Sequence, residues 1–67
     1  MMFSAEVGND NLEATVTETA HGSKLEITLT IMYMLPTVVF VRDYKTERDA
    51  MEALDRMFPG TVWRITA

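Results

Sequence analysis

The sequence predicts an α+β fold: an antiparallel sheet of four to five strands with one amphipathic helix on one face, in the order β-β-β-β-α-β. Three observations lead to this fold class. Apolar and polar residues alternate along several segments, one segment has helical spacing behind a capping residue, and clusters of turn-forming residues separate the segments. At 67 residues, the chain 1–67 is expected to form a single compact domain.

The first two strands are indicated by a turn cluster and by alternation. Residues 2–7 form a first short strand, which Gly8 and the polar residues 9–11 end. Leu12, Ala14 and Val16 then alternate with polar residues, the pattern of a half-buried strand. A glycine that tolerates positive φ at residue 22 places a tight turn at residues 21–22.

The third and fourth strands follow this turn. One side of the third strand is apolar and comprises Leu25, Ile27, Leu29, Ile31 and Tyr33. The other side begins with Glu26, Thr28 and Thr30 and continues into Met32 and Met34. Pro36 marks the next turn because it lacks a backbone N–H. Residues 38–44 are mostly β-branched and aromatic, which predicts a central strand with little water on either face.

A helix should begin after Thr46 and end before the Pro59-Gly60 pair. Thr46 and Asp49 have the spacing of a capping box. An apolar stripe is expected from Met51, Leu54 and Phe58, flanked by Ala50 and Met57. Ion pairs are expected among Arg48, Glu52 and Arg56, which are spaced four apart. Residues 62–66 should form a final short strand.

Composition narrows the class of function. A net charge of −4 and a pI near 4.7 argue against a direct nucleic-acid binder, which needs a basic face. The same charge favours docking on a basic protein surface or imitation of nucleic acid. The chain has no cysteine, no signal-peptide pattern, and no uncharged run long enough for a membrane helix. We therefore expect a cytoplasmic protein that does not bind membranes.

The sequence offers little that points to catalysis. His21, the single imidazole, lies in a turn, and neither Ser4 nor Ser23 has a base nearby in the sequence. The helix carboxylates are interleaved with arginines, which is typical of a solvated helix face rather than of a metal site. No glycine-rich phosphate loop is present. We expect a protein without enzymatic activity, cofactor or metal.

A binding surface is expected on the sheet face that the single helix leaves open. This face should carry threonines, with Met32 and Met34 forming an apolar corner. From the fourth strand it would receive either Val39 and Val41 or Phe40 and Arg42. The candidate partner-binding residues are Glu13, Glu26, Thr28, Thr30, Met32, Met34, Phe40 and Arg42. The occupant of the face could be a second copy of the chain or a different protein.

Several short motifs in a set order resemble a known family. They are Gly22-Ser23-Lys24-Leu25, then Arg42-Asp43-Tyr44, then Thr46 with a short acidic helix, then Pro59-Gly60 and Arg64-Ile65. Their order and spacing are similar to those of small phage-encoded anti-CRISPR proteins of the type I-F class. The resemblance implies an antiparallel sheet flanked by helix and a non-enzymatic inhibitor in the bacterial host cell. Such inhibitors bind the backbone subunit of the CRISPR surveillance complex and keep target DNA from pairing with the guide. Occluding the guide channel would suffice, because R-loop formation is nearly balanced energetically.

The family's contact residues are not retained in this sequence. Two tyrosines and a glutamate that make contacts in the family fall here at about Glu6, Thr19 and Thr30, and the family's second helix has no counterpart up to Ala67. The resemblance therefore implies a partner, a basic nucleic-acid-binding surface on a protein subunit of a type I surveillance complex, but no contact residue. The alternative is a small homodimeric structural or accessory protein that self-associates through its open sheet face.

Overall fold

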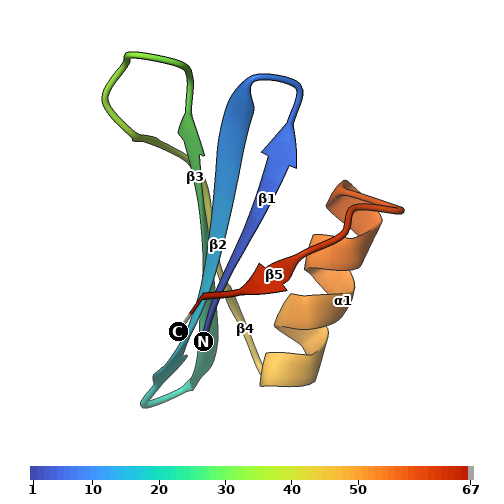
Figure 1. Ribbon diagram of the computed structural model, residues 1–67. Coiled ribbons are helices and arrows are strands. Elements are labelled where there is room, and N and C mark those ends of the chain that lie inside the picture. Colours follow the sequence, from blue (N-terminus) through green and yellow to red (C-terminus); the bar gives the residue numbers. More distant parts are fainter. Residues whose placement is uncertain (67) are drawn as a thin grey trace.

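The computed structural model describes residues 1–66 and has an antiparallel five-stranded sheet with one helix (Figure 1). The elements are β1 (Met2–Val7), β2 (Asp10–Thr19), β3 (Gly22–Thr30), β4 (Thr37–Tyr44), α1 (Glu47–Met57) and β5 (Arg64–Ile65). The strands lie in the order β4-β3-β2-β1-β5, so α1 carries the chain from one edge of the sheet to the other. The α+β class and the order β-β-β-β-α-β are confirmed. Within the described residues, no helix is long and apolar enough to cross a membrane.

The register of the meander collects apolar side chains on one face. Leu12, Ala14 and Val16 of β2 lie opposite Leu29, Ile27 and Leu25 of β3, and Phe3 of β1 lies opposite Ala14. Helix α1 packs on this face, which we call the helix face. The buried hydrophobic residues are Phe3, Ala5, Leu12, Ala14, Val16, Leu25, Ile27, Ala50, Ala53 and Leu54. The core is therefore a single layer between sheet and helix.

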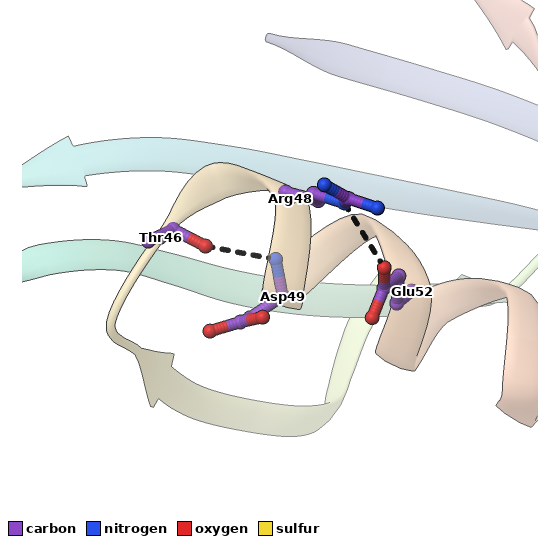
Figure 2. Close-up of polar contacts among 4 residues, drawn as sticks. All are labelled: Thr46, Arg48, Asp49 and Glu52. Carbon is purple, nitrogen blue, oxygen red and sulfur yellow. Dashed lines mark hydrogen bonds and ion pairs between the residues drawn. The ribbon is translucent and has the colours of Figure 1, made fainter.

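Helix α1 begins as its capping signal predicts. The Asp49 backbone N–H donates to the Thr46 hydroxyl oxygen over 3.1 Å, which satisfies one of the unpaired donors of the first turn (Figure 2). Arg48 of the first turn and Glu52 of the second form an ion pair on the solvent side, with Arg48 Nε 3.2 Å from Glu52 Oε1 (Figure 2). Both side chains are exposed, so this ion pair adds little to stability.

The buried side of α1 is made mainly of small residues. Ala50, Ala53 and Leu54 are buried, whereas Met51 and Phe58 pack only partly against the core. Met57, expected to flank the apolar stripe, is exposed. The two alanines allow the helix to lie close to the sheet, so Leu54 becomes the central contact and the longer side chains lie around it.

Strand β3 is shorter and β4 more exposed than the sequence pattern suggests. β3 ends at Thr30, so Ile31 and Tyr33 lie in the β3–β4 loop (residues 31–36) instead of on a buried strand face. β4 is an edge strand that is largely exposed, which corrects the expectation of a central strand. β-branched residues favour strands in general, and they do not determine a strand's position in the sheet.

The chain returns through Pro59-Gly60 to the opposite edge. Phe58 ends the helix and packs edge-to-face on Trp63, with ring centroids 5.9 Å apart. β5 contains two residues rather than the five expected, and Ile65 and Arg64 pair with Phe3 and Ser4 of β1.

Candidate partner-binding surface

The sheet face opposite α1, which we call the open face, is polar and rich in threonine. Its members are identified by the strand register, since residues paired across antiparallel strands point to the same side. They include Ser4, Glu6, Asn11, Glu13, Thr15, Thr17, Lys24, Glu26, Thr28, Thr30, Val41, Asp43 and Arg64. The structure therefore brings together four of the candidate residues, Glu13, Glu26, Thr28 and Thr30.

Four carboxylates form a line across the open face. Glu6 of β1 lies opposite Asn11, two residues before Glu13 on β2. Glu26 of β3 lies opposite Thr15, two residues beyond Glu13, and Asp43 of β4 lies opposite Lys24 in the row of Thr17. Each carboxylate is thus one strand across and two residues along from the previous one, which corresponds to about 7–8 Å. We call Glu6, Glu13, Glu26 and Asp43 the acidic diagonal.

Two basic side chains of the open face lie beside this line. Lys24 is the cross-strand neighbour of Asp43 at one end, and Arg64 is next to Ser4 on β1. The middle of the diagonal, Glu13 and Glu26, has threonines as cross-strand neighbours on β2 and β3. Strands β1 to β4 therefore each carry one carboxylate on the open face, and neither Glu13 nor Glu26 has a basic cross-strand neighbour.

The other four candidate residues lie elsewhere. Phe40 and Arg42 pair with Ile27 and Leu25, which places both on the helix face. There Phe40 packs partly against the core, and the Arg42 guanidinium lies 5.6 Å from the centre of the Tyr44 ring. Met32 and Met34 belong to the β3–β4 loop and not to a strand, so neither lies among the threonines of the open face.

The β3–β4 loop lies at one end of the sheet (Figure 1). It exposes a run of large apolar side chains. The run comprises Ile31, Met32, Tyr33, Met34 and Leu35. Tyr33 is 99% exposed and has a φ of 63°, a conformation that costs free energy for a residue with a bulky side chain. The Met34 N–H donates to the Ile31 carbonyl oxygen over 2.9 Å, so Tyr33 lies within a tight turn that presents its ring to solvent.

Sequence reasoning missed Tyr33 because apolar alternation continues from Leu25 through Ile31 to Tyr33. Pro36 indicates a turn near this point, but no residue in 31–36 is a glycine or asparagine that would mark the position of positive φ.

A shallow apolar hollow lies where the loop meets the sheet. It has a volume of about 160 Å³ and is lined by Leu29, Ile31, Met34, Leu35, Thr37 and Val39. Most of the residues that line the hollow belong to the loop and to the start of β4. The strand residue among them, Leu29, belongs to the helix face. Met34 is thus part of an apolar surface, although one separate from the open face.

The remaining residues considered for chemistry differ in their exposure. His21 is exposed in the turn between β2 and β3, and Ser23 is buried on the helix face. Among the residues that the structure describes, no group of three or more His, Cys, Asp or Glu side chains could hold a metal ion.

Comparison of the chain with known proteins gives no relative from which a function could be carried over. No protein-family model, no curated protein and no solved structure matches it significantly.

Proposed function

We propose that this protein is a non-enzymatic anti-CRISPR inhibitor that binds a type I CRISPR surveillance complex and blocks recognition of target DNA. The choice of target rests on the similarity in order and spacing of the motifs from Gly22-Ser23 to Arg64-Ile65. The observation that carries the mode of action is the acidic diagonal, with an exposed apolar loop beyond the end of the same sheet.

The acidic diagonal supports a basic, nucleic-acid-binding groove as the docking site. Its carboxylates are regularly spaced along a line, as are the phosphates of a nucleic-acid strand. A protein of net charge −4 would also be attracted to such a groove before contact is made. Occupation of the groove would keep DNA away from the guide without any chemical step.

The β3–β4 loop supports a second, apolar point of contact. Tyrosine and methionine are enriched in interfaces, and exposed aromatic side chains often supply much of the binding energy. Tyr33 is held at positive φ with its ring in solvent, and such strained positions cluster at functional sites. Together, charge on the open face would orient the inhibitor and the loop would anchor it.

Self-association through the open face has less support. The centre of that face consists of threonines and carboxylates, its exposed valines Val38 and Val41 lie at the β4 edge, and the large exposed side chains belong to the loop. Two copies facing each other across the open face would place one acidic diagonal against another, which is repulsive.

The test is binding to purified type I surveillance complexes of several subtypes, followed by measurement of target-DNA capture. We expect stoichiometric binding to at least one subtype, with loss of DNA capture and weaker binding at higher salt. The proposal is wrong if no subtype binds the protein and DNA capture is unchanged at micromolar inhibitor.

Two substitutions examine the two contact regions separately. Glu26→Lys reverses charge in the middle of the diagonal and Tyr33→Ala removes the ring of the loop, and we expect each to weaken binding at least about tenfold. Glu26→Lys should also reduce the salt dependence. Val62→Ala, at an exposed site between α1 and β5, is the control and should bind normally. Circular dichroism should show an unchanged fold for all three, and normal binding by both test variants would contradict the proposed surface.

A further inference from the structure

Strand β4 has one unused edge. β3 pairs with one side of β4, and within the described residues nothing pairs with the other side. We infer that β4 pairs antiparallel with β4 of a second copy of this chain, around a two-fold axis at Val41, to give a continuous ten-stranded sheet. This inference concerns assembly and does not depend on the proposed function.

The character of β4 favours strand pairing. Edge strands are usually protected by short length, charged side chains, proline, β-bulges or a covering segment. β4 has Arg42, Asp43 and a bulge near Val38, but no lysine or proline and no covering segment within the described residues. β4 is eight residues long and exposes Val38, Val39 and Val41, each about half accessible. Its pairing with β3 is irregular near Val38, but residues from Phe40 to Tyr44 are in regular register and can present a straight ladder.

The exposed area of the chain is also larger than expected for a compact monomer of its mass. A compact monomer of 7.6 kDa is expected to expose about 4,300 Å². This chain exposes 4890 Å², an excess of roughly 600 Å² that approaches the ~800 Å² each partner buries in a standard interface. The exposed valines of β4, Val38, Val39 and Val41, contribute to this excess.

We infer a second copy, and not a foreign protein, as the partner that covers the exposed edge of β4. Among the described residues, ten buried hydrophobic residues, four of them alanines, make a small core, and domains of this size are marginally stable. Burial of further surface against a partner would therefore add usefully to the stability of the chain. A second copy is present whenever the protein is made, whereas a foreign target is not.

Side-chain direction and charge favour one register. In a two-fold antiparallel pair, facing residues must point to the same side of the sheet, so the axis passes through a single position. An axis at Arg42 would set two guanidinium groups directly opposite each other, which is unfavourable. An axis at Val41 instead sets Val41 against its own copy and Arg42 opposite Phe40 of the second copy, where an aliphatic stem can pack on a ring.

The proposed pairing leads to a closed dimer and not to a fibre. It uses the β4 edge of both copies, and the remaining outer edges are formed by β5, which is only two residues long. An assembly with no further long edge stops at two subunits. The two-fold axis stands perpendicular to the sheet, so both open faces point the same way.

The first experiment is sedimentation equilibrium on the purified protein alone. We expect the native chain to show twice its 7.6 kDa mass at about 100 μM and to dissociate on dilution. Val41→Lys places two ammonium groups at the axis and should raise the dissociation constant at least about 100-fold. Val62→Lys, at a site 84% exposed and far from β4 in the sheet order, is the matched control and should remain dimeric.

A monomeric native chain at every concentration would overturn the inference, as would a folded Val41→Lys variant that still dimerises. Circular dichroism identifies a variant that fails to fold. If Val41→Lys fails to fold, the cysteine experiment described next tests the pairing of β4 with its copy instead. Neither result depends on any CRISPR component, so failure of the dimer and failure of the proposed function are distinguishable.

The second experiment tests the register. The chain has no cysteine, so Val41→Cys introduces a single thiol. Facing residues of an antiparallel pair have Cα atoms about 4.5–5.5 Å apart, within the usual range for a disulfide. Under a glutathione redox buffer, Val41→Cys should form a disulfide-linked dimer much faster than Val62→Cys. Equal rates for the two variants would show that Val41 does not lie at the axis.

Discussion

Gly22 is the residue whose identity the structure constrains most. It has a φ of 145° at the first position of β3, and its Cα faces the backbone carbonyls of Tyr44 and Lys45. A Cβ at this position would lie 2.7 Å from the Lys45 oxygen and closer still to that of Tyr44. Glycine therefore allows the β2–β3 turn to lie against the segment that joins β4 to α1.

We expect Gly22→Ala to destabilise the protein by more than about 2 kcal/mol, since it combines a backbone clash with an unfavourable φ. Urea denaturation measures this change. Gly8→Ala is the control: Gly8 also has positive φ, but a Cβ added there would meet no atom within 4 Å, so only the conformational cost of about 1 kcal/mol applies. Equal losses for the two variants would mean that the contact with Tyr44 is unimportant.

At the scale of the element, α1 depends on its first turn. The helix has 11 residues, a length at which helices are not stable alone, and the Thr46 hydroxyl accepts the Asp49 N–H. We expect Thr46→Ala to lower the free energy of unfolding by about 1 kcal/mol and Thr46→Ser to change it little. Thermal unfolding followed by circular dichroism compares the two. A loss of stability in the serine variant equal to that in the alanine variant would argue against capping.

The strands show which features of the sheet can be predicted from alternation of apolar and polar residues. Alternation alone predicts that Glu13, Glu26, Thr28 and Thr30 avoid the core, and the structure places them on one face. Alternation could not predict where β3 ends, because a strand extends only while its neighbour supplies partners. Thr30 pairs with Asn11, and β2 begins one residue earlier, so the residues after Thr30 leave the ladder.

The same limit applies to the candidate site. Whether Phe40 and Arg42 or Val41 and Asp43 join the open face depends on how β4 aligns with β3, and a β-bulge near Val38 shifts that alignment. The acidic diagonal depends on three registers at once, so no pattern within one strand could reveal it. The exposure of Tyr33 could not be predicted either, because it depends on the geometry of the turn after β3.

At the scale of the whole molecule, a small core is combined with a large exposed apolar surface. If two chains share the β4 edge, folding and association are coupled, and the midpoint of thermal unfolding should rise with protein concentration. Between about 5 and 500 μM we expect a rise of several degrees for the native chain. Val41→Lys should show a lower midpoint without this dependence. A midpoint independent of concentration in the native chain would indicate that each chain folds alone.

The pairing of Phe3 with Ile65 has a consequence for the rate and order of folding. Strands β1 to β4 are joined as successive neighbours by turns or by one short loop, so each pairing forms between segments close in the chain. The β1–β5 pairing must instead close nearly the whole chain, at an entropic cost of about 3–4 kcal/mol for two residue pairs. We therefore expect the four-stranded meander to form early and β5 to join it last, after α1 has packed against the sheet.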